Sequence, residues 1–505
     1  FIQTLVSLAT GPFPPPIRSL WQKRDQLSTF FRIGLKKTSR APVTECVIDP
    51  PNLDALPILK TWPHDGGHFI TLPLVYTQEP LKGTPNLGMY RIQRFDKKTT
   101  GLHFQIGKGG GFHYHRAQEL GQPLPVTIFV GGPPALIISA IAPLPENVPE
   151  LIFASLLQNQ KLATTKIPSH PHSLISQCEF ALIGEAIPHE RRMEGPFGDH
   201  FGYYSQAHEF PVFHCKKIYH RKGAIYPATV VGKPIQEDLY IGDFLQKLMS
   251  PLFPVVMPQV KALHTFAETG FHPLAAAIVK ERYEKECLSA AFRILGEGQL
   301  SLTKVLMITD QAIDITNIKI LLETILARFS PSHGLYIFSK TSNDTLDYTG
   351  PKLNHGSKAL FLGVGSVKRT LPRSFRGVLP RPFSRAVPFC PGCLLIDGPS
   401  YRELSDLSAL AQHPDFADWP LLIVTDDAPK TALSDLEFLW TVFTRFDPAQ
   451  DILAKTCEVK NHHLSYSLPL VIDARFKPTY PPEVAPDEAT KRLVDSKWAS
   501  YFSRT

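Results

Sequence analysis

The pattern of apolar and polar positions changes character near residue 275. Before that point, short apolar runs alternate with turn-forming residues, a pattern that predicts strands at 69–75, 89–95, 101–106, 126–130, 210–219 and 228–231. Helical periodicity interrupts these strands at about 115–120 and 150–157. So many short strands favour a split-barrel or sandwich-like core over a doubly wound parallel sheet.

Beyond residue 275, single apolar runs alternate with helical periodicity. Residues 276–279 and 305–308 predict buried strands, and 317–329 predicts an amphipathic helix. The segments 305–331 and 421–448 share a sequence pattern that we call the Asp–Arg echo. Asp310 precedes Arg328 by 18 positions in the first segment, and Asp426 precedes Arg445 by 19 in the second. We interpret the echo as a doubled strand-helix unit within one α/β domain. The alternative is that two ordinary strand-helix units converged on similar sequences.

The tail at 487–502 predicts a helix that begins with an acidic cap. Its apolar residues lie largely on one helical face: Leu493, Val494, Trp498, Tyr501 and Phe502. A terminal helix with such a face needs a surface against which to dock.

Composition narrows the class of protein. The chain has 505 residues, 43% hydrophobic and 20% charged, as in ordinary globular proteins. Its net charge of +7 is dispersed without a basic run, which argues against a nucleic-acid partner.

No apolar stretch reaches the roughly 18 residues of a membrane span, so we expect no stable membrane insertion. Residues 1–9 predict a first helix instead of a signal peptide. Seven cysteines, an odd number, indicate reduced thiols and a cytoplasmic location.

The clearest candidate chemistry lies at 191–205, Arg-Arg-Met-Glu-Gly-Pro-Phe-Gly-Asp-His-Phe-Gly-Tyr-Tyr-Ser. Glu194 and Asp199 flank a Gly-Pro-Phe-Gly turn, which can direct both carboxylates into one cavity. Two carboxyl groups in different environments hold different pKa values, so one can stay ionised while the other transfers a proton. The alternative is an exposed turn with solvated acids.

This string resembles the signature E-G-P-F-G-[DE]-x-x-G-Y of the UbiD family of reversible decarboxylases. A second segment, Asn86-Leu87-Gly88-Met89-Tyr90-Arg91, is similar to the N-x-G-x-Y-R strand of that family. The resemblance implies an α/β (α+β) protein with a split-barrel, flavin-reductase-like domain that holds the cofactor, and an α/β oligomerisation domain. On that basis we expect an N-terminal α/β segment at 1–80, the cofactor domain at 81–270, the domain with the doubled unit at 271–477, and a linker with a docking helix at 478–505.

The resemblance also implies roles for individual residues. Arg91, Glu194 and Asp199 match the catalytic trio: Arg91 would hold the carboxylate or the cofactor, Asp199 would donate the proton after carbon dioxide leaves, and Glu194 would orient Arg91 and relay the proton. The cofactor would be prenylated flavin mononucleotide (FMN). Its expected neighbours are Thr71, Gly88, Met89, Arg91 and, for the phosphate, Lys358.

For the metal, the resemblance implies Asn86 and Glu150 as ligands of Mn²⁺ or Mg²⁺, with K⁺ as a further candidate ion. The match fails at Gly107, where the family commonly has a histidine before Lys-Gly-Gly. This departure leaves three alternatives: His103, His113 or His115 substitutes, water fills the position, or metal and cofactor binding are impaired.

The resulting hypothesis is a non-oxidative carboxy-lyase acting on an aromatic or α,β-unsaturated carboxylic acid, in ubiquinone or menaquinone biosynthesis. A polyprenyl-hydroxybenzoate or a dihydroxynaphthoate would be the substrate. The rival hypotheses are a non-catalytic flavin- or phosphate-binding homologue and a redox protein with unmodified FMN. The expected partners are a flavin prenyltransferase that supplies the cofactor and further copies of the chain in a homo-oligomer.

Overall fold

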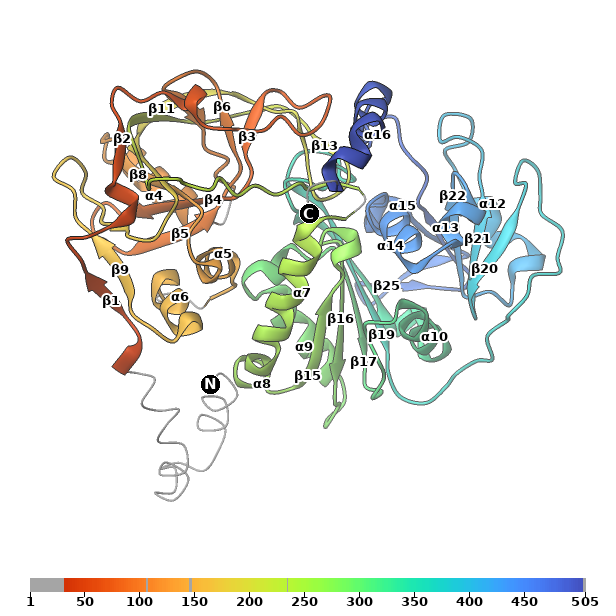
Figure 1. The fold of residues 1–505 in the computed structure, drawn as a ribbon. Coiled ribbons are helices and arrows are strands. Elements are labelled where there is room, and N and C mark those ends of the chain that lie inside the picture. The colour runs from red at the N-terminus through yellow and green to blue at the C-terminus, as the bar shows by residue number, and fades with distance from the viewer. Residues whose placement is uncertain (1–30, 106–107, 145–147, 234, 503–505) are drawn as a thin grey trace. The chain divides into compact units, whose positions relative to one another are not determined.

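A computed structural model describes residues 31–105, 108–144, 148–233 and 235–502, which form two compact units (Figure 1). The N-terminal unit comprises the described residues up to Ile241 together with those from Pro481 onward, and the C-terminal unit comprises those from Gly242 to Tyr480. The helix predicted at 1–9 and the departure at Gly107 both lie outside the described residues.

The N-terminal unit is organised around a curled antiparallel sheet, in which nine strands are described. In spatial order they are β3 (His68–Ile70), β6 (Ile92–Arg94), β7 (Thr99–Gly101), β14 (His208–His220), β11 (Phe180–Glu194), β8 (Leu124–Val130), β4 (Pro73–Gln78) and β5 (Pro85–Met89), with β2 (Cys46–Ile48) paired to β14. Two small sheets accompany it: β1 (Leu35–Lys37), β9 (Leu162–Thr165) and β10 (Leu174–Ile175), and the pair β12 (Phe197–Gly198) and β13 (Tyr204–Ser205).

This large sheet buries both of its faces. Along β8, Val126 and Ile128 point into one core, whereas Phe129 points into a second core on the other face. The helix α4 (Gly109–Glu119) covers the first core, and α5 (Pro134–Ile141) and α6 (Glu150–Gln158) cover the second. Because each buried aliphatic or aromatic side chain contributes about 1.5–3 kcal/mol, the two cores fix the strand register on which the site depends.

The C-terminal unit contains two five-stranded sheets with the same strand order and the same directions. The first runs β15 (Val260–Thr265), β16 (Leu274–Val279), β17 (Val305–Thr309), β19 (His355–Gly363) and β18 (Leu335–Ser342). The second runs β20 (Ala386–Cys390), β21 (Cys393–Asp397), β22 (Leu421–Thr425), β26 (Leu470–Asp473) and β23 (Ile452–Ala454). In each sheet three parallel strands lie between two antiparallel edge strands. A duplication of one strand-helix unit stays our proposal, and this shared topology supports it.

The helices of the C-terminal unit fill the space between and outside its two sheets. They are α8 (Phe253–Val256), α9 (Glu286–Leu295), α10 (Ile318–Arg328), α11 (Pro331–Gly334), α12 (Ser408–Gln412), α13 (Ala428–Ala432), α14 (Asp435–Phe443) and α15 (Pro448–Asp451). The same unit also contains a hairpin of β24 (Cys457–Lys460) and β25 (His463–Tyr466). Met307 of β17 and Ile423 of β22 belong to one common core, so the two sheets pack as one body. The helices α9 and α10 cover opposite faces of the first sheet (Figure 1).

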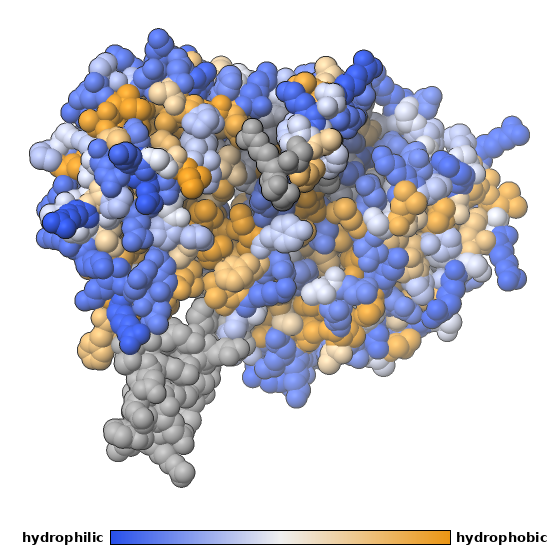
Figure 2. All heavy atoms as spheres, in the orientation of Figure 1, coloured by the Kyte–Doolittle hydropathy of each residue, from blue (hydrophilic) through white to orange (hydrophobic). Residues whose placement is uncertain are grey.

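Two further helices complete the described chain. The helix α7 (Glu237–Met249) begins in the N-terminal unit and continues into the C-terminal unit, and α16 (Glu488–Phe502) is the last described element. No residue of α16 is buried, and Leu493, Trp498, Tyr501 and Phe502 are each more than half exposed. Elsewhere on the visible surface of the N-terminal unit, hydrophilic residues are interspersed with apolar ones (Figure 2). None of the described helices is long and apolar enough to span a membrane.

The predicted mixture of strands and helices is confirmed, but several of the predicted strand limits are wrong. The strand predicted at 69–75 is two strands, because β3 pairs with β6 whereas β4 pairs with β8. The strand predicted at 89–95 is likewise divided into β5 and β6, which leaves Arg91 between two strands. The strand predicted at 101–106 ends at Gly101. The strand predicted at 228–231 does not form, and its last carbonyl, that of Val231, instead accepts the indole N–H of Trp62 at 2.8 Å.

Candidate active site

The signature turn connects the end of β11 to β12, and it is held by Gln93 of β6 and by the loop that contains Asp65 and Gly66. Gly195 has φ of +95°, a conformation that glycine adopts without strain. Its N–H donates to Oε1 of Gln93 at 2.7 Å, and the N–H of Gly198 donates to Oδ1 of Asp65 at 2.8 Å. A Cβ on Gly66 would lie 2.0 Å from the carbonyl oxygen of Gly195, so the two backbones touch. The turn is therefore rigid, and it fixes the carboxylates at its two ends.

Arg91 joins the two carboxylates of the turn. Its Nε donates to Oε1 of Glu194 at 2.9 Å, and its Nη1 forms an ion pair with Oδ2 of Asp199. Its Nη2 donates to Oγ of Ser205 at 2.9 Å, and its guanidinium lies 4.9 Å from the ring centre of Phe197. The structure thus brings together the three residues that the sequence analysis selected as catalytic, from segments more than 100 positions apart.

Burial and pairing set the charge of these acids. Glu194 is fully buried and Asp199 is 8% exposed. Burial alone would raise the pKa of both carboxyl groups, but the positive charge of Arg91 lowers the pKa of Glu194. For Asp199, the hydrogen bond from His200, with Nδ1 2.8 Å from Oδ1, and the charge of Arg91 outweigh burial and hold its pKa well below the usual value. Both acids are therefore ionised at neutral pH in this arrangement.

His103 is a fourth member of the network. Its Nδ1 lies 2.9 Å from Oε1 of Glu194, and its ring packs on Phe210 with centroids 4.2 Å apart. Burial lowers the pKa of His103, so the imidazole is neutral and donates its Nδ1 hydrogen to the carboxylate. Its Nε2 is a buried atom without a hydrogen-bond partner among the described residues. His103 is therefore part of the Glu194 network.

The residues predicted to contact the cofactor lie in or beside the strands that lead to Arg91. Oγ1 of Thr71, between β3 and β4, accepts the N–H of Thr229 at 3.0 Å. Gly88 in β5 lies under the ring of Tyr90, because a Cβ there would come within 2.5 Å of that ring. Met89 ends the same strand, opposite Leu74. Contact of these residues with a flavin stays a prediction.

The predicted metal ligands come from β5 and from the first turn of α6. Oε2 of Glu150 accepts the N–H of Leu87 at 3.1 Å, so its carboxylate reaches the residue next to Asn86. A Cβ on Gly109 would lie 2.1 Å from Oδ1 of Asn86, which places the first turn of α4 against this amide. The Nδ2 atom of Asn86 is buried without a partner among the described residues. Burial raises the pKa of Glu150, as expected for a carboxylate that lacks a counter-ion.

The two remaining histidines proposed as substitutes for the ligand missing at Gly107 differ in their surroundings. His115 is largely exposed and faces Glu119, with Nε2 and Oε1 3.5 Å apart. His113 is buried, and its Nδ1 lies 2.9 Å from Oγ1 of Thr77. Thr77 is the partner of Asn86 in the β4–β5 ladder, so the two side chains emerge on the same face of the sheet. Of the three histidines, His113 is the one that the fold places beside Asn86.

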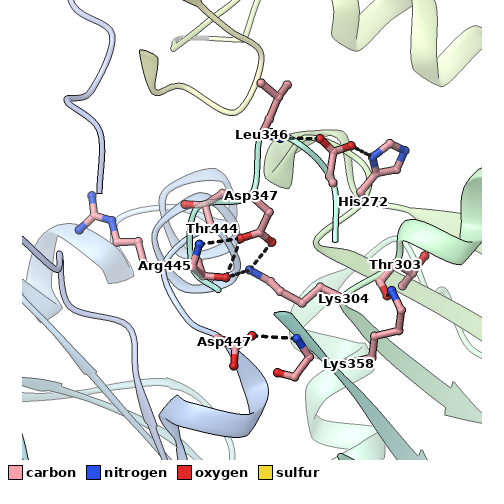
Figure 3. A network of polar contacts seen from close by, with 12 residues as sticks. His272, Thr303, Lys304, Leu346, Asp347, Lys358, Thr444, Arg445 and Asp447 are labelled. Atoms are coloured by element: carbon pink, nitrogen blue, oxygen red, sulfur yellow. Dashed lines mark hydrogen bonds and ion pairs between the residues drawn. The ribbon is translucent and has the colours of Figure 1, made fainter. Parts of the chain in front are cut away.

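Lys358 belongs to the C-terminal unit, in a buried polar network at the amino ends of its first sheet (Figure 3). Its Nζ donates to the carbonyl of Thr303 at 2.8 Å. Lys304 lies nearby and forms an ion pair of 2.9 Å with Asp347. Burial, reinforced by the charge of Lys304, lowers the pKa of Lys358 to about 8 in spite of the opposing effect of Asp347. Contact of this lysine with a phosphate stays a prediction.

This fold is that of a known family of lyases. Two family models match the chain: the 3-octaprenyl-4-hydroxybenzoate carboxy-lyase Rift-related domain at residues 35–234, and the C-terminal domain of the same carboxy-lyase at 239–363. The chain belongs to the UbiD family of carboxy-lyases, which confirms both the predicted family and the predicted class of enzyme. The second sheet of the C-terminal unit lies beyond the residues that these models match.

A relative and two solved structures extend this result. A 4-hydroxybenzoate decarboxylase subunit from Chlamydia pneumoniae is 53% identical over 490 residues, which are 97% of this chain and 83% of the relative. The vanillic acid decarboxylase of Sedimentibacter hydroxybenzoicus in its closed form has a TM-score of 0.62 at 23% identity, over 75% of this chain and 82% of that one. The UbiD-class enzyme HmfF of Pelotomaculum thermopropionicum, in complex with FMN, has a TM-score of 0.59 at 22% identity, over 75% and 84%. At these identities the two structures show a common fold.

Proposed function

We propose that the chain catalyses the non-oxidative, reversible decarboxylation of an aromatic or α,β-unsaturated carboxylic acid with prenylated FMN as cofactor. The observation that carries this proposal is the contact of one buried arginine, Arg91, with both Glu194 and Asp199. Two buried acids on one guanidinium form the kind of charged cluster that proton transfer in an active site uses. The name of the C. pneumoniae relative and the FMN bound to HmfF support the proposal. When bound, the modified flavin would accept electron density as the carboxylate leaves.

Arg91 would control when the acids take up a proton. In the arrangement described, the hydrogen bond from His200 and the charge of Arg91 together hold the pKa of Asp199 too low for that group to be protonated at neutral pH. A substrate carboxylate beside Arg91 would compete for the guanidinium, weaken its pull on Asp199 and Glu194, and raise the pKa of both. Substrate binding would thus lead to protonation of Asp199. Asp199 would then donate this proton to the carbon atom that carbon dioxide has left. Glu194, bonded to the same guanidinium, would return a proton to Asp199 between turnovers.

The residues around Asn86 fit a divalent cation bound to a cofactor phosphate. Among the residues that the structure describes, no three histidine, cysteine or acidic side chains gather as a complete metal site. Mg²⁺ and Mn²⁺ on a phosphate draw several ligands from phosphate oxygens and water, so Asn86 and Glu150 would supply only part of the coordination. The amides at the start of α4, beside Asn86, would face the same phosphate.

Several finer features belong to the same proposal. The curled sheet would act as a flavin-reductase-like split barrel, and a separate flavin prenyltransferase would supply the cofactor. The exposed apolar residues of α16 would pack in a homo-oligomer. The reaction would take place in the cytoplasm, in ubiquinone or menaquinone synthesis, on a polyprenyl-hydroxybenzoate or a dihydroxynaphthoate. The ion set of Mn²⁺ or Mg²⁺ with K⁺ comes from the family resemblance.

The test is to produce the protein together with a flavin prenyltransferase and to record its absorbance spectrum and metal content. We expect modified flavin and manganese in the parent, and loss of both in Asn86→Ala and Glu150→Ala. Glu119→Ala is the matched control, because it removes an exposed acid from α4. Release of carbon dioxide from a panel of aromatic acids then identifies the substrate, and Arg91→Ala should abolish that release.

The outcomes separate the rival functions. A parent without flavin and metal, under conditions that load another UbiD-family enzyme, contradicts the decarboxylase proposal and favours a non-catalytic homologue. A parent that retains only unmodified FMN and turns over no acid favours redox chemistry.

A further inference from the structure

The decarboxylation proposed above needs a supply of protons. When a carboxylate leaves as carbon dioxide, a hydrogen takes its place on carbon, so each turnover consumes one proton from solution. The two acids of the site are poorly placed to collect it, because the side chains of Glu194 and Asp199 are 0% and 11% exposed. A proton that Glu194 returns to Asp199 must first have entered the site. The place where protons enter is therefore part of the mechanism.

Among the described residues, three polar side chains contact these acids: those of Arg91, His103 and His200. Arginine stays protonated in proteins and does not pass a proton on. The side chain of Arg91 is 8% exposed, and that of His103 is 5% exposed. The side chain of His200, in contrast, is 26% exposed. Of the three, His200 is the one that joins a titratable group to solution.

His200 is bound to one particular oxygen of Asp199. Its Nδ1 lies 2.8 Å from Oδ1, whereas Oδ2 is paired with Arg91. An ionised carboxylate only accepts hydrogen bonds, so Nδ1 carries the hydrogen of this contact. The backbone N–H of His200 donates to the same Oδ1 at 2.7 Å, and the imidazole packs edge-on against Phe201 with centroids 5.1 Å apart. The ring is thus held with Nδ1 against the acid, and Nε2 lies on its other side.

A second carboxylate, that of Asp238 in the first turn of α7, lies close to the same imidazole. Burial raises the pKa of Asp238, and the charge of His200 opposes this effect. Oδ1 of Asp238 also accepts the N–H of Gln236 at 3.2 Å. Two carboxylates near one imidazole favour its protonated form, because both negative charges stabilise the added positive charge. These surroundings suit a histidine that takes up a proton and holds it beside Asp199.

We propose that His200 supplies the protons of the reaction, acting through Asp199. Nε2 would take up a proton from solution, and the imidazolium would pass its Nδ1 proton to Oδ1 of Asp199 when the substrate weakens the pull of Arg91. The neutral ring, with its hydrogen on Nε2, would return through exchange with water to the form protonated on Nδ1.

The protons balance in this scheme, since one enters from solution at His200 for each one that Asp199 gives to carbon. The proton that Glu194 and Asp199 exchange would thus enter the site at His200. This inference rests on the proposed function, in which Asp199 is the proton donor.

The experiment measures kcat and KM for carbon dioxide release by the flavin-loaded protein, with kcat expressed per bound flavin. His200→Ala should lower kcat about tenfold or more and leave KM within about twofold of the parent, because the proton supply is removed and Arg91 is retained. His200→Asn keeps an amide N–H for Asp199 but cannot carry a proton, so its kcat should fall as far. Added imidazole should restore much of the kcat of His200→Ala in proportion to its concentration.

His214→Asn is the matched control. His214 is also partly exposed and paired with a carboxylate, since its Nε2 lies 2.8 Å from Oε2 of Glu190, but Glu190 is not an acid of the site. This variant should keep the kcat and KM of the parent. Added imidazole should change kcat neither in this variant nor in the parent.

The outcomes separate this inference from the function on which it rests. A parent that carries modified flavin but releases carbon dioxide from no acid of the panel overturns the proposed function, and this inference with it. An active parent whose kcat is matched by both His200 variants overturns the inference alone. If His200→Asn matches the parent while His200→Ala is slow, or if imidazole restores nothing, His200 holds Asp199 in place without supplying protons, which also overturns the inference.

Discussion

His103 Nδ1 lies 2.9 Å from Oε1 of Glu194, the same carboxylate oxygen that accepts the Nε hydrogen of Arg91 at 2.9 Å. The other oxygen, Oε2, is buried without a hydrogen-bond partner among the described residues. Two donors on one oxygen leave the second oxygen as the more basic of the two. The arrangement therefore selects Oε2 as the atom of Glu194 that would take up a proton.

The first prediction concerns the donor that His103 supplies. In His103→Ala, the buried carboxylate of Glu194 loses one hydrogen bond, so its pKa should rise by about one unit. If ionised Glu194 is required, the acidic limb of kcat against pH should move upward by a similar amount, whereas kcat at neutral pH should change little because Glu194 stays ionised there. Carbon dioxide release between pH 4 and 8 measures both effects. His103→Asn retains an amide donor and should keep the parent profile. An unchanged profile in His103→Ala would contradict the role given to this contact.

A second prediction comes from a pair of histidines away from the site, of which His172 is buried and His170 is half-buried. Nε2 of His170 lies 3.3 Å from Nδ1 of His172, and both contact Oγ1 of Thr127, at 3.0 and 3.1 Å. Burial lowers the pKa of His172 to about 3, whereas the unfolded chain binds this proton near pH 6.5. Because the unfolded state then binds more protons, the free energy of unfolding should fall as pH decreases below 6.5.

Urea unfolding at a series of pH values tests this point. Between pH 6.5 and 4.5 the parent should lose about 2–3 kcal/mol through His172 alone. His172→Gln should show a correspondingly shallower decline over the same interval. His115→Gln, an exposed histidine, is the control and should follow the parent. Parallel curves for the parent and His172→Gln would contradict a depressed pKa in the folded state.

The sequence was sufficient for the residues that act within one motif or one short segment. Glu194 and Asp199 flank a turn whose glycine and proline content is visible locally, and the Arg91 segment carries its own pattern. The Asp–Arg echo likewise marks two central strands, β17 and β22, that occupy equivalent places in their sheets.

What the sequence could not provide depends on pairing between distant segments. His103 meets Glu194 across 91 positions, and no local pattern marks that contact. The 15-residue strand β11 is long because it pairs first with both β8 and β14 and then with β14 alone, which its mixed apolar and charged sequence does not show. The N–H of Ser357 meets Oδ1 of Asp447 across 90 positions, and no local pattern marks that contact either.

The third prediction concerns the ligand missing at Gly107. His113 is buried beside Thr77, which faces Asn86 across the ladder, and burial lowers its pKa so that the ring is neutral and able to bind a metal. His113→Gln should therefore weaken Mn²⁺ binding about tenfold or more in the flavin-loaded protein. His115→Gln, two positions away on the exposed side of the same helix, should bind Mn²⁺ like the parent. Equal manganese content in the two variants after dialysis would show that water or another group completes the site.

The last prediction separates the two buried lysines of the C-terminal unit. Because burial lowers the pKa of Lys358 to about 8, its charge opposes folding at pH 7, and Lys358→Met should raise the free energy of unfolding by up to about 3 kcal/mol. This gain in the free energy of unfolding should shrink as pH rises from 8 toward 10, because Lys358 of the folded parent loses its proton over this range.

Lys304→Met is the contrasting variant. It leaves Asp347 without its ion-pair partner in a buried site, so it should lower the free energy of unfolding by about 3 kcal/mol or more. Urea unfolding at pH 7 and pH 10 measures both variants. Lys358→Met could be more stable than the parent and also bind FMN less tightly. This result would show that the charge of Lys358 lowers the stability of the fold and serves binding. A destabilising Lys358→Met would instead make Lys358 a structural residue, needed for its bond to the carbonyl of Thr303.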